Sequence, residues 1–148
     1  MCSSDLDEGV LDKMRWLRGE KLPLETGGAL LGCWDLSRQI LYLVDVTGAP
    51  EDSIEKATAF IRGSQDLPRW IAETSRLTGG AIEYVGEWHS HPVGYPTSPS
   101  EDDRKVFHWI DEHLSIDGLP PAMLIVGETE LRWLTTEDGN GVTWKFPN

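Results

Sequence analysis

The chain has 148 residues and carries 25 acidic against 13 basic side chains, so its formal net charge is −12. This length suits one domain with its own core, because a domain of about 150 residues buries roughly 68–70% of the surface that its unfolded chain exposes. The charge excludes sequence-independent nucleic-acid binding, which needs Lys and Arg to neutralise phosphates, and it disfavours attachment to an anionic membrane surface.

Signals for export or membrane insertion are absent from the sequence. No run of about eighteen apolar residues is present, and no positively charged start leads into the apolar core of a signal peptide. Cys2 and Cys33 are the only cysteines, too few for a disulfide framework, and Cys33 lies in an apolar run that predicts a buried thiol. We therefore expect a cytoplasmic protein with no nucleic acid and no membrane among its partners.

The first half of the chain predicts a tail, a helix and two strands. Residues 1–6 are expected to be a disordered or foreign tail, which leaves 7–148 as a single domain. Apolar residues recur at helical spacing from Leu6 to Leu17, and Gly19 is expected to end that helix. The pattern then predicts a buried strand over 27–34, a hairpin link over 35–39, a strand over 40–46 and a loop over 47–55.

The second half predicts two more helices and further strands. An amphipathic helix is expected over 67–77, ended by Gly79 and Gly80, and Ser100 is expected to cap a third helix. The other expected elements are a strand over 82–89, an irregular loop over 92–99, a strand over 122–126 and a hairpin of 131–134 with 142–146. This order predicts an α/β fold, a single-domain mixed twisted sheet with helices packed on its faces.

The stretch that carries chemistry is His89-Ser90-His91-Pro92. On a strand, residues i and i+2 point to the same face, so both imidazoles converge on one point. Imidazole is a common zinc ligand, and a catalytic zinc keeps three protein ligands and an open position for water. Pro92 ends the strand, which places the histidine pair at a strand terminus.

The loop after this strand can return a carboxylate to the metal, because Ser100-Glu101-Asp102-Asp103 begins the third helix. Two His and one Asp would leave the fourth position of a Zn²⁺ ion to water, whose pKa the metal then lowers to about 7. A hydrolase also needs a base and a donor for the developing oxyanion. Glu25, which precedes Gly27-Gly28, is the candidate base, and Ser100 is the candidate donor.

Together these residues resemble the JAMM (MPN-plus) metallopeptidase family. Glu25-Thr26-Gly27-Gly28, His89-Ser90-His91-Pro92 and Ser100-x-x-Asp103 follow one another in the order of the family pattern. The resemblance implies the family's α/β architecture, which is like that of cytidine deaminases, and one zinc with a bound water, held by His89, His91 and Asp103. It also implies that Glu25 is the catalytic acid/base and that Ser100 steadies the tetrahedral intermediate.

The resemblance further implies a substrate and a setting. Family members hydrolyse isopeptide or peptide bonds at the C-terminus of ubiquitin or ubiquitin-like proteins, and others act on sulfur-carrier proteins. Gly86-Glu87-Trp88-His89 looks like small bacterial members, which are often encoded beside activating-like and conjugating-like enzymes, including in anti-phage systems. We therefore expect a zinc isopeptidase that opens an amide at the C-terminal tail of a ubiquitin-like protein, in deconjugation or in precursor processing.

Several assignments stay open on the sequence. The loop from His91 to Asp103 is one residue longer than the usual family spacing, which would make Asp102 the ligand, whereas the Ser-x-x-Asp spacing favours Asp103. Glu87 shares the strand face of His89, so it either orients a metal ligand or is a solvated strand acid. The alternative functions are a non-catalytic binding scaffold and a zinc hydrolase of small peptides. A nucleoside deaminase is excluded, because no Pro-Cys-x-x-Cys follows.

Overall fold

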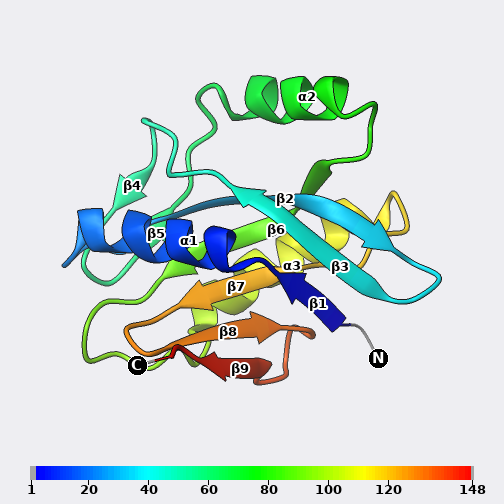
Figure 1. The fold of residues 1–148 in the computed structure, drawn as a ribbon. Coiled ribbons are helices and arrows are strands. Elements are labelled where there is room, and N and C mark those ends of the chain that lie inside the picture. Colours follow the sequence, from blue (N-terminus) through cyan, green and yellow to red (C-terminus); the bar gives the residue numbers. More distant parts are fainter. Residues whose placement is uncertain (1–2, 148) are drawn as a thin grey trace.

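A seven-stranded mixed sheet with the strand order β1-β3-β2-β6-β7-β8-β9 lies at the centre of this computed structural model, which describes residues 3–147 (Figure 1). β4 and β5 form a separate two-stranded hairpin. The described elements are, in chain order, β1 (Ser3–Leu6), α1 (Glu8–Lys21), β2 (Gly27–Asp35), β3 (Ile40–Val46), β4 (Ile54–Glu55), β5 (Phe60–Ile61), α2 (Leu67–Leu77), β6 (Glu83–Ser90), α3 (Glu101–Ser115), β7 (Met123–Val126), β8 (Glu130–Leu134) and β9 (Val142–Lys145).

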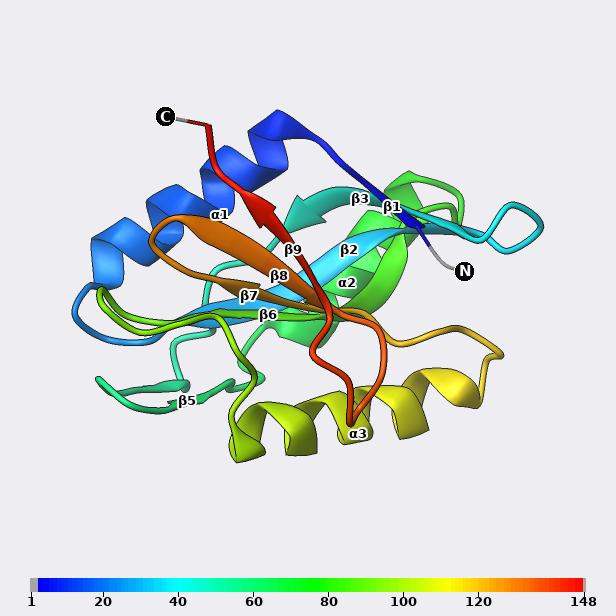
Figure 2. The ribbon, with the colours of Figure 1, turned by 90° about the horizontal axis from the view of Figure 1, so that it is seen from below.

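The two faces of the main sheet carry different helices, as Figure 2 shows. Val10 and Met14 of α1 belong to a core cluster on one face, and Phe107, Ile110 and Leu114 of α3 belong to a second cluster on the opposite face. α2 contributes no residue to either core cluster and contacts β6. No helix of the described residues is long and apolar enough to cross a membrane. The predicted fold class, a mixed sheet with helices on its faces, is confirmed.

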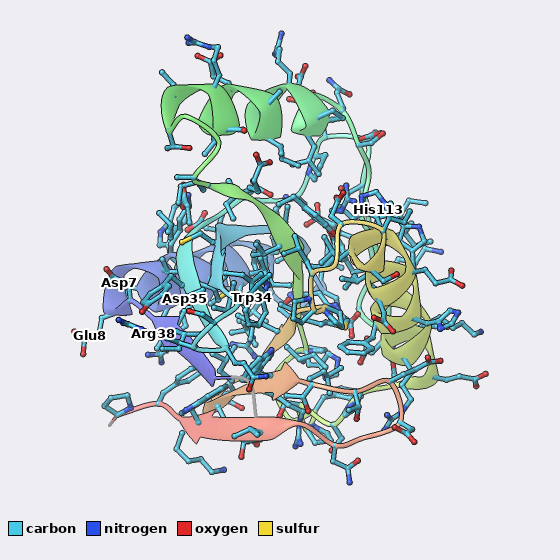
Figure 3. All side chains as sticks on the ribbon, turned by 90° about the vertical axis from the view of Figure 1, so that its right-hand side faces the viewer. Asp7, Glu8, Trp34, Asp35, Arg38 and His113 are labelled. Atoms are coloured by element: carbon cyan, nitrogen blue, oxygen red, sulfur yellow. The ribbon has the colours of Figure 1, made fainter. Side chains whose placement is uncertain are left out.

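Most of the predicted strands and the helices α2 and α3 are also confirmed. α2 stops before Gly79 and Gly80, whose φ values of 62° and 83° glycine reaches without a steric penalty. The predicted link over 35–39 joins the antiparallel strands β2 and β3. Its turn is closed by Asp35, which accepts a hydrogen bond from the Arg38 N–H at 3.1 Å, as short polar side chains do in turns (Figure 3).

The end of the first helix was predicted wrongly. Gly19 does not end α1, which continues to Lys21. A glycine inside a helix costs only about 1 kcal/mol relative to alanine, and packing of the buried face of α1 outweighs that cost. The helix ends before Pro23, whose ring disfavours helical backbone in the preceding residue.

The ends and loops of the first third differ from prediction at three further points. Residues 3–6 form β1 and pair in parallel with β3, whereas they were predicted to belong to a disordered or foreign tail; residues 1–2 lie outside the described part of the chain. Whether this segment is native to the domain stays a prediction.

The predicted loop over 47–55 contains β4, which is too short to produce a periodic pattern. Cys33 is half-buried rather than fully buried.

β6 lies inside the sheet, antiparallel to β2 and parallel to β7. Gly27 pairs with His89, and a Cβ on Gly27 would lie 2.2 Å from the carbonyl oxygen of Trp88 and 2.8 Å from the Cβ of His89. A Cβ on Gly28 would lie 2.1 Å from the carbonyl oxygen of Thr47. The two glycines therefore allow a close approach of main chains beside the histidine-bearing end of β6.

We expect Gly27→Ala to lower the free energy of unfolding by about 1–3 kcal/mol, the usual cost of overpacking, because its methyl group would clash with main-chain atoms. Gly19→Ala is the matched control, since nothing lies within 4 Å of its added Cβ and alanine favours a helix by up to about 1 kcal/mol. Urea unfolding of both variants measures the difference. Equal stabilities would contradict this account of the glycine pair.

Candidate metal centre

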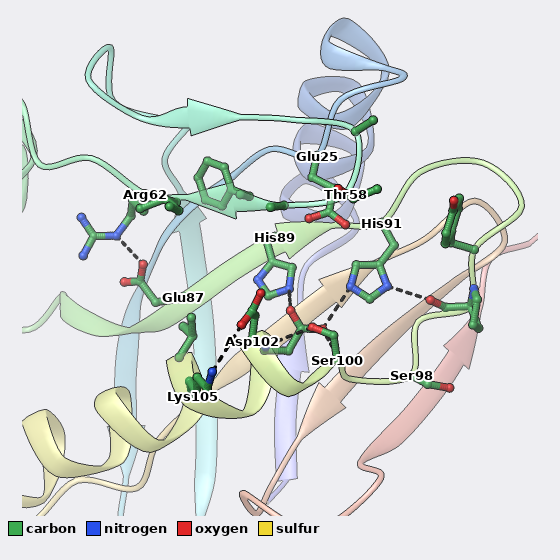
Figure 4. Close-up of a pocket in the computed structure, with 18 of the residues that line it drawn as sticks. Glu25, Thr58, Arg62, Glu87, His89, His91, Ser98, Ser100, Asp102 and Lys105 are labelled. Atoms are coloured by element: carbon green, nitrogen blue, oxygen red, sulfur yellow. Dashed lines mark hydrogen bonds and ion pairs between the residues drawn. The ribbon is translucent and has the colours of Figure 1, made fainter.

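His89 and His91 lie at the end of β6 and point into one cleft (Figure 4). The residues between and before them point the other way: Trp88 packs in the core cluster on the α1 side, and the Ser90 hydroxyl accepts a hydrogen bond from the Thr26 N–H at 3.0 Å. Both histidines are buried, and their ring centroids are 5.6 Å apart. The strand period of two therefore brings both imidazoles to the same place.

The N-terminus of α3 brings Asp103 to these imidazoles. Ser100 Oγ accepts a hydrogen bond from the Asp103 N–H at 3.1 Å, and the Ser100 N–H donates to Asp103 Oδ2 at 2.7 Å, which is a capping box. These bonds fix the carboxylate, whose Oδ1 lies 2.6 Å from His89 Nε2 and whose Oδ2 lies 3.1 Å from His91 Nε2. One ligand atom from each of the three residues lies within 4.8 Å of the other two.

The Nε2 atoms of both imidazoles face the Asp103 carboxylate. His91 Nδ1 lies 2.7 Å from the carbonyl oxygen of Pro96, which can only accept, so Nδ1 is the protonated nitrogen of the neutral imidazole, and Nε2 lies 3.1 Å from Asp103 Oδ2. His89 Nε2 is buried without a hydrogen-bond partner, because its short approach to Asp103 lacks hydrogen-bond geometry. Two imidazole nitrogens and a carboxylate gathered at one point fit a divalent metal ion, and this donor set suits zinc.

Asp102, the other carboxylate that the sequence left open, lies at the rim of the cleft. Its side chain is 82% exposed, and its Oδ1 lies 3.7 Å from Lys105 Nζ (Figure 4). The Asp103 side chain, by contrast, is 9% exposed. The geometry therefore favours Asp103 as the metal ligand, and the loop over 92–99 accommodates the additional residue between the histidines and α3.

Burial and polar contacts shift the pKa values of Asp103 and His91 in opposite directions. Burial raises the pKa of Asp103, but its contacts with His89 and His91 and the hydrogen bond from the Ser100 N–H outweigh burial and hold the pKa well below its usual range. Burial lowers the pKa of His91, but the contacts with Asp103 and the Pro96 carbonyl outweigh it and raise the pKa. A buried carboxylate that stays ionised is suited to hold a cation.

Glu25 approaches the histidines from the segment before β2. Because Gly27 pairs with His89, Glu25 comes opposite His91, and Figure 4 shows its carboxylate directed toward the two imidazoles. Its N–H donates to the carbonyl oxygen of Lys56 at 2.8 Å. Burial raises the pKa of Glu25 above its ordinary value, although attraction to His89 and His91 opposes this. A carboxyl group with a raised pKa beside a metal site is suited to proton transfer.

A cleft of about 770 Å³ opens over these groups. Residues 57–59, in the turn between β4 and β5, line one wall, and Val106 and Trp109 of α3 line the other. Ser100 also lines the cleft, and because its Oγ accepts from the Asp103 N–H, its hydroxyl hydrogen can still be donated to a bound molecule. The structure thus brings Glu25 and Ser100, the predicted acid/base and donor, to the same cleft as the three candidate metal ligands.

Sequence reasoning missed two arginines that support this region. Arg18 of α1 is 8% exposed, and its Nε donates to the His91 carbonyl oxygen at 2.9 Å, which anchors the end of β6 to α1. Arg62, next to β5, forms an ion pair with Glu87. Glu87 is buried and also accepts a hydrogen bond from the Tyr84 hydroxyl, so of the two alternatives that the sequence left open, the solvated strand acid is wrong.

Comparison with known proteins gives a family and several relatives. The profile of the family described as prokaryotic homologs of the JAB domain matches residues 7–137. The chain is 38% identical over 103 residues to a protein named CD-NTase/cGAS isopeptidase from Enterobacter hormaechei subsp. hoffmannii, a match covering 70% of this chain and 55% of that protein. It therefore spans about half the length of this relative.

Two further relatives match more of their own length. A CD-NTase/cGAS isopeptidase from Escherichia coli is 28% identical over 118 residues, covering 80% of this chain and 70% of that protein. A protein from Sinorhizobium fredii named probable metalloprotease y4qB is 26% identical over 129 residues, covering 87% of this chain and 78% of that protein. These names indicate that hydrolases are found among the relatives of this chain.

Solved structures share the fold at low sequence identity. A JAB1/MPN domain protein from Archaeoglobus fulgidus superposes with a TM-score of 0.54 and 18% identity, covering 96% of this chain and 94% of that one. A protein from Desulfitobacterium hafniense superposes with a TM-score of 0.57 and 17% identity, covering 99% of this chain and 90% of that one. The likeness to the archaeal protein shows that the sheet and helices are arranged as in JAB1/MPN domains.

We expect Asp103→Asn to weaken zinc binding by at least about 100-fold, because it removes the charged ligand between the two imidazoles. Asp102→Asn is the matched control one residue away, and it should keep one zinc per chain because its side chain is exposed. Elemental analysis of both purified variants measures the metal. Loss of zinc from Asp102→Asn together with retention in Asp103→Asn would show that the ligand is misassigned.

Proposed function

The chain belongs to the family of prokaryotic JAB-domain homologues, and on that basis we propose that it is a zinc-dependent isopeptidase acting at the C-terminus of a ubiquitin-like protein. Relatives named isopeptidase and probable metalloprotease support a hydrolase. The observation that carries the proposal is the meeting of Glu25 with His89, His91 and Asp103 in one cleft, from three separate segments of the chain.

Different residues of the cleft carry out different steps of amide hydrolysis. When bound, zinc supplies Lewis-acid chemistry, which polarises a carbonyl group and acidifies a water molecule. Glu25 takes the proton of the attacking water and returns it to the leaving amine, a transfer that its position beside His89 and His91 allows. Ser100 donates its hydroxyl hydrogen to the developing oxyanion while its oxygen caps α3.

The shape of the cleft favours an extended substrate with small side chains. Residues 57–59 are Ala, Thr and Ala, so this wall carries little side-chain bulk and an extended peptide can approach its main chain closely. The flexible tail of a ubiquitin-like protein, ending in glycine, has this form. We propose that the conjugated target is a CD-NTase-type enzyme, because two of the relatives are named for such a target.

Cleavage mapping tests this function. The zinc-loaded protein is incubated with a ubiquitin-like protein joined through its C-terminus to a CD-NTase, and with short peptides, and the products are identified by mass spectrometry. We expect a cut after the last residue of the ubiquitin-like protein, loss of cleavage with a chelator and recovery with zinc. Hydrolysis of the peptides alone would favour a small-peptide hydrolase, and binding without cleavage would favour a scaffold.

The proton-transfer role predicts that Glu25→Gln keeps one zinc per chain and lowers kcat by about 100- to 10,000-fold. Glu101→Gln is the matched control, because that carboxylate is 88% exposed on the first turn of α3, and its kcat should equal that of the wild type. Kinetics and metal analysis of the two variants measure these effects. Undiminished cleavage by Glu25→Gln would refute the assignment of the base.

A further inference from the structure

A series of side chains connects the two walls of the cleft. Arg62, which follows the hairpin β4–β5, forms an ion pair with Glu87 on β6 (Figure 4), and the Tyr84 hydroxyl donates to the other carboxylate oxygen. The ring of Tyr84 meets His113 of α3 edge to face, with centroids 6.1 Å apart. His113 stacks at 5.1 Å on Trp109, which lines the opposite wall. We term these five residues the Glu87 cluster.

Glu87 is the centre of this cluster, and its burial makes the loss of either hydrogen-bond partner energetically costly. Its side chain is 7% exposed, that of Arg62 is 20% exposed, and both carboxylate oxygens are engaged. A buried charge that loses its partner is strongly destabilised, so each member of the pair holds the other in place. Arg62 Nη1 also donates to the Gly63 carbonyl oxygen at 2.7 Å, and the Gly63 N–H donates to Ser53 Oγ at 2.9 Å. The arginine is thereby tied to both sides of the hairpin base.

A β-bulge in β6 makes the cluster possible. The consecutive residues 30–31 of β2 pair with Gly86 and Tyr84, which leaves Val85 without a partner of its own. Val85 packs in the core cluster on the α1 side, whereas Tyr84 packs against the cluster on the α3 side. In a regular strand, Tyr84 and Glu87 would point to opposite faces, because they are three residues apart. The bulge places them on the same face.

The hairpin wall and Glu25 share one main-chain hydrogen bond, but each also has contacts of its own. Glu25 continues a main-chain pairing in which the Ser90 N–H donates to the Thr26 carbonyl oxygen at 2.7 Å. The turn of the hairpin accepts a hydrogen bond from the Glu25 N–H at the Lys56 carbonyl oxygen. Glu55 of β4 forms an ion pair with Lys21 of α1 at 3.0 Å, and Arg62 ties the base of the hairpin to Glu87. Release of the base would therefore move the wall that contacts the substrate while the β2–β6 pairing keeps Glu25 beside the metal site.

From these contacts we infer that the Glu87 cluster positions the hairpin wall, and thereby sets how tightly the cleft holds an extended substrate. The inference rests on the proposed function. Arg62 and Glu87 are positioning residues: they fix the wall that residues 57–59 present, and they take no part in proton transfer. A merely structural role would lower stability without changing KM, whereas a positioning role raises KM at nearly constant kcat.

The test compares Arg62→Gln with the wild-type protein, using the cleavage assay, zinc analysis and amide hydrogen exchange. We expect KM to rise about tenfold, kcat to stay within about twofold, and zinc to stay at one per chain. Exchange over 54–61 should accelerate about tenfold, while exchange in β7 stays unchanged. Arg62→Lys keeps the charge, so its KM and its exchange rate over 54–61 should lie between those of the wild type and Arg62→Gln. Arg76→Gln, which removes an exposed arginine paired with Glu73 on α2, is the control and should match the wild type.

Unchanged KM and unchanged exchange in Arg62→Gln would overturn the inference, and so would a loss of zinc or kcat at constant KM. If that variant does not fold, Tyr84→Phe replaces it, because it removes one hydrogen bond to Glu87 and keeps the ion pair. Tyr84→Phe must then show a smaller rise in KM and a smaller acceleration of exchange over 54–61. The absence of both would overturn the inference. If the wild type cleaves no conjugate, the proposed function fails, while the exchange measurement still tests the cluster.

Discussion

The double role of the Asp103 carboxylate is the constraint on which the rest of the site depends. It accepts a hydrogen bond from the Ser100 N–H at the start of α3, and it also faces the Nε2 atoms of His89 and His91. The beginning of a helix and the third side chain of the candidate metal site are thus one structural element. The Ser-x-x-Asp spacing follows from this, because a side chain at the third helical position is the one that reaches back to the capping residue. The same cap places the Ser100 hydroxyl in the cleft.

The charges that line the cleft are arranged so that negative charge remains where a metal would bind. Its two cations are each paired away from the site, Arg62 with Glu87 and Lys105 with Asp102. Asp103 is left to neutralise a cation between the histidines. Part of the net charge of −12, which first served only to exclude nucleic acid, therefore has a place in the proposed chemistry.

Most features that depend on local rules were predictable from the sequence, the end of α1 excepted, whereas the meeting of Glu25 and Asp103 with the histidines was expected mainly through the family resemblance. The shared face of His89 and His91 follows from the strand period, and the cap at Ser100 follows from helix chemistry. The hairpin β4–β5 and the bulge at Val85 leave no periodic signal, because each involves too few residues. Arg18 did leave a signal: it continues the four-residue spacing of the buried Val10 and Met14, a position where a charged residue requires a partner.

The central claim is that β6 and α3 meet at a zinc ion held by two imidazoles and one carboxylate. X-ray absorption spectroscopy at the zinc edge of the loaded wild-type protein tests it most directly. The account predicts two histidine nitrogens at about 2.0–2.1 Å, oxygen ligands in the remaining positions, and no sulfur. A spectrum with sulfur scattering, or one without imidazole ligands, would contradict it.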